Sequence, residues 1–359
     1  MHNVEVRHDA DAHEIASRTH TAPDLLHLFR AVNEEWERGE DSDVRPNEPG
    51  QSPAEDRLSY LRAGGFETEA MVESMRAHYE HMIASIGVPP EDQIGCDLGC
   101  WFGFSTACMA SLGLPMVYGV DLMTWKAEIA ERWRTRHGFD NLRFRPMRPG
   151  SIPLRSQSVD WVLMNQVYCN AVVDSFWDSV REARRILKPG GVLIISDANN
   201  PWCDAAIERM QTSFHTREIG DGTRDAPRGQ NRNARLSIIR NEAPELTEPD
   251  AARLANETCY MHEPLIRAAA REMCRTGATP ASRFEPSHYR SPIIPVSGAA
   301  NGNNPDPFEI ARDLERLGFG ELDITCSPIR QRLGNDELWN QIRDSQGFFV
   351  WANKLGESI

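Results

Sequence analysis

Short apolar runs alternate with segments of helical periodicity between residues 91 and 198, and this alternation constrains the fold more than any other feature of the chain. The apolar runs are QIGCD, MVYGVD, LRFRP, VDWVLMN and VLIISD, and the periodic segments include GFSTACMASLG, TWKAEIAERWRTRHG and SFWDSVREARRILKPGG. Nearly continuous apolar strands separated by helices are typical of a parallel sheet covered on both faces. Right-handed crossovers bring the carboxyl ends of such strands to one edge, where ligands bind.

Three further regions surround this alternating core of residues 91–198. We expect residues 1–90 to form a helical N-terminal cap, with one helix after Pro23 and a second that ends near Gly87. Residues 199–305 are polar and rich in Arg and Pro, with one evident helix over 263–277, and are predicted to form an insertion that acts as a lid. Residues 306–359 contain a helix and two strands, with a helical segment between the strands, which together complete the core sheet.

Charge and cysteine content exclude several classes of protein. The chain carries 39 Lys and Arg against 53 Asp and Glu, a net charge of −14, which is the wrong sign for extensive nucleic-acid binding. No apolar run approaches the roughly 20 residues of a membrane span, and the N-terminus lacks the pattern of a signal peptide. The eight cysteines are scattered and complete no zinc-binding set, so we expect free thiols, no metal site and a cytoplasmic location.

The segment between the first predicted strand and its helix carries the most chemical information. Gly99 allows the backbone to turn sharply beside a ligand, and Gly103 allows the helix to begin close to the sheet, with free N–H groups that favour an anion. Asp97 is placed to accept a hydrogen bond from an amine. Asp121 ends the second strand, 24 residues further along (121 − 97 = 24), where a carboxylate commonly binds ribose hydroxyls. The pattern therefore predicts a site for a nucleoside that bears both an amine and a carboxylate.

These segments resemble the class I S-adenosylmethionine-dependent methyltransferases. The matching pieces are DLGCWFG, YGVDLM, SIPLRSQSVDWVLMNQVY and ARRILKPGGVLIIS, which cover residues 91–198 well and the C-terminal region less distinctly. The resemblance implies an α/β, Rossmann-like methyltransferase fold: a seven-stranded, mostly parallel sheet with helices on both faces and strand order 3-2-1-4-5-7-6, strand seven antiparallel. The helical N-terminal cap and a large insertion after strand five are then additions to that fold.

The resemblance also implies the cofactor, S-adenosyl-L-methionine, and the part of it that each residue contacts. Gly99 and Gly103 would lie along the methionine moiety near Asp97, Asp121 would bind the ribose, and Leu122 would contact the adenine. Asn165 and Gln166 would line the methionine end. The full set of predicted cofactor-binding residues is Asp97, Gly99, Cys100, Trp101, Gly103, Asp121, Leu122, Arg148, Asn165 and Gln166.

Two of these positions depart from the family pattern. Trp101 stands where the family loop usually has a third glycine, and its indole either crowds the cofactor or points away while the backbone alone is used. Arg148 stands where the family often has an acid that binds the adenine amine, and a backbone carbonyl is then the alternative partner.

The acceptor side of the site is less defined by the sequence. His215 and His262 are candidate general bases, and each has a competing interpretation as a packed or surface residue. The arginines of the insertion either form a solvated charged face or clamp an anionic acceptor. The N-terminal helices either cover the active site or form a homodimer contact.

The predicted function is methyl transfer to a hydroxyl or amine of a small-molecule acceptor, with anionic and sugar-like acceptors included. Neither nucleic acid nor a membrane is an expected partner. Fold alone does not fix function, so two alternatives stay open. One is an enzyme that uses the cofactor for cyclisation or rearrangement without methylating, and the other is a non-catalytic binding protein.

Overall fold

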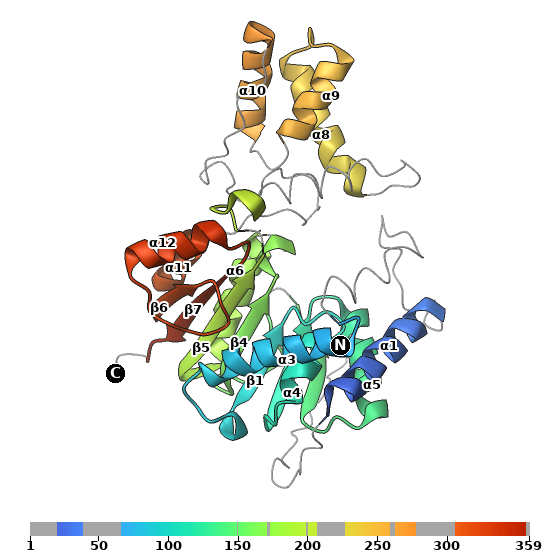
Figure 1. The fold of residues 1–359 in the computed structure, drawn as a ribbon, viewed down its shortest axis with the longest axis vertical. Coiled ribbons are helices and arrows are strands. Elements are labelled where there is room, and N and C mark those ends of the chain that lie inside the picture. The colour runs from blue at the N-terminus through green and yellow to red at the C-terminus, as the bar shows by residue number, and fades with distance from the viewer. Residues whose placement is uncertain are drawn as a thin grey trace, which may run out of the picture.

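A single seven-stranded sheet forms the centre of the computed structural model (Figure 1). The structure describes residues 20–38, 66–148, 150–170, 173–198, 200–206, 227–258, 263–277 and 306–356. The strands are β1 (Ile94–Leu98), β2 (Met116–Asp121), β3 (Leu142–Pro146), β4 (Val159–Asn165), β5 (Leu187–Asp197), β6 (Phe319–Thr325) and β7 (Phe348–Lys354). Their order is β3-β2-β1-β4-β5-β7-β6, and β7 runs antiparallel to both of its neighbours. This is the order and the direction that the family resemblance implies.

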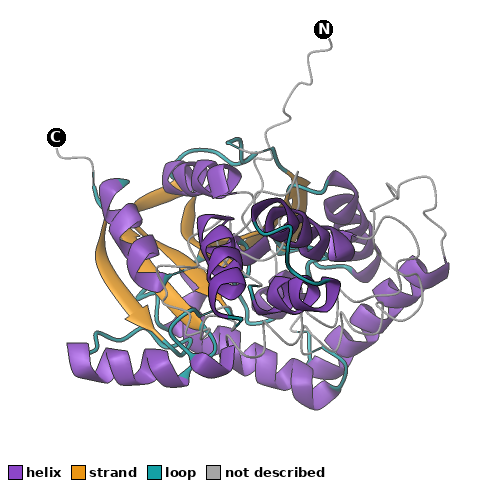
Figure 2. Ribbon diagram, turned by 90° about the horizontal axis from the view of Figure 1, so that it is seen from above, coloured by secondary structure: helices purple, strands orange, loops and turns teal. Residues whose placement is uncertain are grey.

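Helices cover both faces of the sheet (Figure 2). One face packs against α1 (Ala22–Arg38), α3 (Glu69–Ala84), α4 (Phe104–Ala110) and α5 (Thr124–His137), and the other against α6 (Val173–Ile186), α11 (Pro307–Arg316) and α12 (Asn335–Asp344). Side chains alternate between the two cores, so that Leu163 and Ile194 face the first and Val162 and Leu193 face the second. The alternation follows from the two-residue period of a strand. Short 3-10 turns, η1 (Pro90–Asp92) and η2 (Tyr168–Asn170), complete the connections.

The apolar faces of helices α1 and α3 are buried inside this chain. Leu25 and Phe29 of α1 join Val72 and Met82 of α3 in the first core, and Phe29 packs against Phe104 with ring centroids 4.6 Å apart. Among the described residues, no helix combines the length and the apolar character that crossing a bilayer requires.

Three helices in the region 199–305 pack around a small core of their own. They are α8 (Pro227–Glu242), α9 (Glu248–Glu257) and α10 (Glu263–Thr276), and Figure 1 shows them as a separate bundle. The sequence predicts only α10, because α8 carries few apolar residues. In the structure Leu236 and Ile239 of α8 are buried against its neighbours, and buried Arg235 donates to the Ala255 carbonyl at 2.7 Å. Packing within the bundle therefore stabilises a helix that its own pattern does not reveal.

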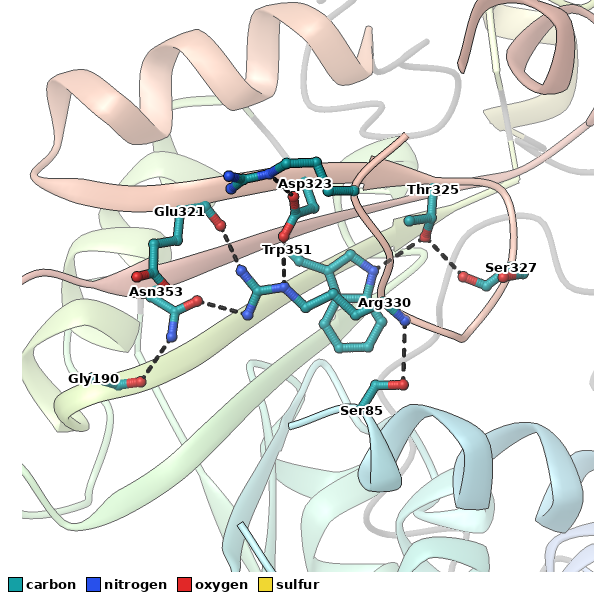
Figure 3. A network of polar contacts seen from close by, with 10 residues as sticks. Ser85, Gly190, Glu321, Asp323, Thr325, Ser327, Arg330, Trp351 and Asn353 are labelled. Carbon is teal, nitrogen blue, oxygen red and sulfur yellow. Dashed lines mark hydrogen bonds and ion pairs between the residues drawn. The ribbon is translucent and has the colours of Figure 1, made fainter. Parts of the chain in front are cut away.

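A partly buried arginine, Arg330, ties the C-terminal end of α3 to the edge of the sheet (Figure 3). The Arg330 guanidinium donates to Asp323 of β6 at 2.7 Å, to the Asn353 side chain of β7 at 2.6 Å and to the Glu321 carbonyl at 2.5 Å. Its backbone N–H donates to Ser85 Oγ at 3.2 Å, and Ser85 is the residue that caps α3. Arg330 thus fixes the position of α3 relative to β6 and β7.

We predict that this arginine contributes far more stability than its neighbour on the same carboxylate. Arg330 and Arg332 both contact Asp323, but their side chains are 15% and 75% exposed. Arg330→Met leaves a buried carboxylate without its main partner and should lower the free energy of unfolding by about 3 kcal/mol. Arg332→Met removes an exposed pair and should cost less than about 1 kcal/mol. Denaturant unfolding of the two variants measures both values, and equal losses would contradict the prediction.

Candidate functional site

Polar side chains gather where the parallel strands end. Asp97 lies near the end of β1, Asp121 ends β2, Asn165 ends β4 and Asp197 ends β5. The chain runs outward from β1 to β2 and β3 and then returns to the other side of β1 as β4. Loops on either side of such a reversal diverge and leave room for a ligand.

The loop after β1 requires glycine at two positions. Gly99 has a φ of 82°, and a Cβ there would lie 2.7 Å from Val167 Cγ2. Gly103 has a φ of 83° and begins α4, and a Cβ there would lie 2.2 Å from the Phe144 ring. A side chain at either position would add both a collision and a strained backbone. The two glycines therefore allow the loop to pass directly from the sheet into the helix.

Asp121 holds this loop to the end of β2. Its Oδ2 accepts from the Trp101 N–H and its Oδ1 from the Met123 N–H, both at 2.8 Å. One carboxylate thus joins the loop after β1 to the loop after β2, and bonds of this charge-assisted kind are the stronger ones. Leu122 and Met123, which follow it, are 44% and 42% exposed and present apolar surface beside the carboxylate.

Trp101 occupies a backbone conformation that glycine favours. Its φ is 54°, which costs a residue with a side chain about 1 kcal/mol. The indole packs against Phe102 and Phe104, with ring centroids 4.6 and 6.3 Å away, and the Lys126 ammonium lies 5.7 Å from its ring. These contacts, together with the bond from its N–H to Asp121, hold the residue in place.

Asp97 is a buried carboxylate with no cationic partner in the described part of the chain. It is 2% exposed and accepts from Thr106 Oγ1 at 2.7 Å. Burial raises the pKa of Asp97 to about 7, the charge of Asp121 adds to the increase, and the Thr106 hydrogen bond opposes it. A cation placed beside this carboxylate would relieve the cost of burying its charge.

The remaining predicted cofactor residues lie on adjoining loops. Asn165 pairs with Ser196 of β5, and the exposed Gln166 has a φ of 54° and donates its N–H to the Ser196 carbonyl at 2.7 Å. Arg148 is exposed in a tight turn after β3, where its backbone pairs with Ser151. The structure brings Asp97, Gly99, Cys100, Trp101, Gly103, Asp121 and Leu122 together around the ends of β1 and β2. The two predicted bases, His215 and His262, lie outside the described residues.

Helix α3 contributes two neighbouring residues that the sequence analysis did not select. The His78 ring lies 5.7 Å from Phe349, which pairs with Ser196 at the carboxyl end of β5. Burial lowers the pKa of His78, and the nearby His81 lowers it further. Tyr79 is buried beside it, with its hydroxyl among polar neighbours that include Asp97 and Asn165. The sequence offered one signal for Tyr79, namely a side chain with a hydroxyl on the apolar face of a predicted helix. Helical periodicity alone assigns such a side chain to the core.

The sequence of this sheet region matches a known family. A family model described as a methyltransferase domain matches residues 96–195. Demethylmenaquinone methyltransferases from two strains of Tropheryma whipplei, Twist and TW08/27, are each 31% identical over 116 residues, which is 32% of this chain and 46% of theirs. The chain therefore spans about half the length of the curated relatives that it matches.

Similar chains also occur among solved structures. A SAM-dependent methyltransferase from Methanosarcina mazei is 16% identical, with a TM-score of 0.40 over 74% of this chain and 94% of that one. A SAM-dependent methyltransferase from Aquifex aeolicus is 11% identical, with a TM-score of 0.38 over 83% and 98% of the two chains.

We predict that Asp97 makes the stability of the ligand-free protein fall as pH rises. The carboxyl group titrates near 3.8 in the unfolded chain and near 7 in the folded one, so the folded state binds the proton more tightly between these values. The free energy of unfolding should therefore decrease from about pH 4 to about pH 7 and level off above that range. Asp97→Asn removes this contribution. The free energy of unfolding of the variant, relative to that of the wild type, should therefore rise by roughly 2–3 kcal/mol between pH 5 and pH 8. Parallel pH profiles of unfolding for the two proteins would contradict the assignment.

Proposed function

Because residues 96–195 form a methyltransferase domain of the class I, S-adenosylmethionine-dependent family, we propose that this chain transfers a methyl group from S-adenosylmethionine to a small molecule. The observation that carries the proposal is the bond pattern of Asp121, which joins the glycine loop to the end of β2 and leaves apolar Leu122 exposed beside it. We propose a hydroxyl or an amine as the methyl acceptor, with anionic and sugar-like compounds as the first candidates.

The residues present fit this cofactor in three respects. A strand-end carboxylate followed by exposed apolar side chains suits a ribose with an attached base. The loop after β1 carries no side chain at Gly99 or Gly103, and the positive φ of both residues lets its backbone turn close to a ligand. Asp97 is a buried carboxylate without a cationic partner among the described residues, which suits an amine.

We assign each residue a role on this basis. Asp121 binds the ribose hydroxyls, Leu122 contacts the adenine and Asp97 accepts from the amine. The backbone of the loop residues, Gly99, Cys100, Trp101 and Gly103, lies along the methionine moiety. Asn165 and Gln166 line the methyl-donor end, and Arg148 lies on the adenine side.

The chain must align the acceptor and take up its proton. When bound, the cofactor supplies a methyl group that the sulfonium charge makes electrophilic. A hydroxyl or amine that gains this methyl loses a proton, so a nearby base is needed. His78 is a candidate because its lowered pKa keeps the imidazole neutral near neutral pH and because Phe349 places it at the end of β5. His215 and His262 remain proposals for the same role.

The α8–α10 bundle is proposed to cover the acceptor. The chain enters the region 199–305 directly from the carboxyl end of β5, which is the edge that carries the site. Arg235 does not contact an acceptor in this proposal, because its buried side chain is bonded to the Ala255 carbonyl. The net charge of −14 supports a small-molecule acceptor over a nucleic acid. A cytoplasmic location and a dimer formed through the N-terminal helices remain part of the proposal.

We predict that Asp121→Asn weakens binding of S-adenosylmethionine about tenfold or more, because the amide loses the charge and cannot accept from both the Trp101 and Met123 N–H groups. Isothermal titration calorimetry measures the affinity. Asp160→Asn is the matched control, since Asp160 accepts from the Ile94 N–H and contacts Lys188 at the opposite end of the sheet. It should leave the cofactor affinity unchanged even where it lowers stability. Equal affinity of the Asp121 variant and the wild type would remove the ribose assignment.

We predict that the protein releases S-adenosylhomocysteine in step with a methylated product. Incubation with methyl-labelled S-adenosylmethionine and panels of hydroxyl- and amine-bearing compounds, among them carboxylates, phosphates and sugars, measures both quantities. The Asp121→Asn protein should lose both in proportion. Tight cofactor binding without turnover on any panel, or conversion of an acceptor without transfer of label, would contradict the proposed methyl transfer.

A further inference from the structure

The hydroxyl of Tyr79 is a buried polar group that makes no hydrogen bond with the described residues. The side chain is 2% exposed and lies on the face of α3 that packs into the first core, together with Val72 and Met82. A buried hydroxyl without a partner costs on the order of 1–3 kcal/mol. Phenylalanine would fill the same space without that cost, so packing alone does not explain the hydroxyl group at this position.

The surroundings of this hydroxyl belong to the candidate site. Its polar neighbours are Ser105, the second residue of α4, and Asn165, the last residue of β4, with the Asp97 carboxylate also near enough to influence it. Asp97 pairs with Leu163 in the ladder between β1 and β4, two residues before Asn165. Tyr79 therefore approaches, from the side of α3, the ends of the two strands that flank the topological reversal.

The chemistry of the hydroxyl complements that of Asp97. Burial raises the pKa of Tyr79 far above its usual range, and the Asp97 charge adds to the increase, so the group stays a neutral donor. A buried carboxylate calls for a cation, whereas a buried hydroxyl donor is best satisfied by an anion. An ammonium and a carboxylate on one carbon atom would satisfy the two groups together.

Resting on the proposed function, we propose that the Tyr79 hydroxyl donates a hydrogen bond to the carboxylate at the amino-acid end of the cofactor, while Asp97 accepts from the amine. Helix α3 is then a wall of the cofactor site. The bonds of Arg330 to Ser85 and Asp323 hold the C-terminal end of α3, and with it Tyr79, against the sheet.

The test is a titration of Tyr79→Phe with three ligands that differ at this end. S-adenosylmethionine carries both the amine and the carboxylate, decarboxylated S-adenosylmethionine carries the amine alone, and 5′-methylthioadenosine carries neither. Tyr79→Phe should bind S-adenosylmethionine about tenfold or more weakly and the other two ligands as the wild type does. Without ligand its melting temperature should equal or exceed that of the wild type, because an unpaired hydroxyl has been removed.

Tyr118→Phe is the matched control, because it makes the same change on β2 at a side chain that packs against the opposite core. It should leave all three affinities unchanged. If Tyr79→Phe binds S-adenosylmethionine as tightly as the wild type, the tyrosine is purely structural and the inference is overturned. Equal weakening for the decarboxylated ligand overturns the carboxylate assignment, and weakening for 5′-methylthioadenosine indicates a general distortion and overturns it as well. A wild-type protein that binds no S-adenosylmethionine defeats the proposed function itself, whatever the variant does.

Discussion

The two hydrogen bonds of the Asp121 carboxylate are the constraint on which the rest of the site depends. They join the N–H of Trp101, in the loop after β1, to the N–H of Met123, in the loop after β2. The backbone N–H groups of Gly99 and Cys100 donate to the Val120 carbonyl at 2.7 and 3.1 Å, so the start of the loop after β1 is already bonded to β2. The carboxylate extends this attachment to Trp101 and to the loop after β2, and its bond to the Trp101 N–H helps to hold the left-handed backbone of that residue. The site is therefore organised before any ligand arrives.

A second constraint acts through helix α3. Its C-terminal end is bonded to the sheet through Arg330, and its buried face lies beside the candidate site. Arg330 bonds to β6, β7 and the Ser85 cap, and the buried face of α3 carries Tyr79 toward the ends of β1 and β4. The C-terminal strands thus influence a site whose residues lie far earlier in the chain. Helix α3 and strands β6 and β7 therefore belong to one connected structural unit.

The sequence predicts the sheet and the loop well and the acceptor side poorly, for identifiable physical reasons. The strands and the expected positions of Gly99, Gly103 and Asp121 rest on local signals: apolar runs, turns that require glycine, and acids at strand ends. The order of the strands in the sheet follows from the family resemblance and not from these signals. Helix α8 carries few apolar residues and depends on tertiary packing, so its sequence pattern does not predict a helix. His78 and Tyr79 lie far from the loop in sequence, and only the packing of α3 on the sheet brings them to it.

The electrostatics of this edge of the sheet cost the folded protein stability. Asp97 and Asp121 are both buried near the same strand ends, and each raises the energy of the other in its charged form. A chain selected for stability alone would replace Asp97 by a neutral residue that still accepts from Thr106. A cation bound beside Asp97 would offset this cost, so the binding energy of such a ligand would include the relief of an unfavourable buried charge. The same argument applies to the buried Tyr79 hydroxyl, which has no hydrogen-bond partner among the described residues and which the Asp97 charge influences, because a ligand with both an ammonium and a carboxylate would satisfy the two groups.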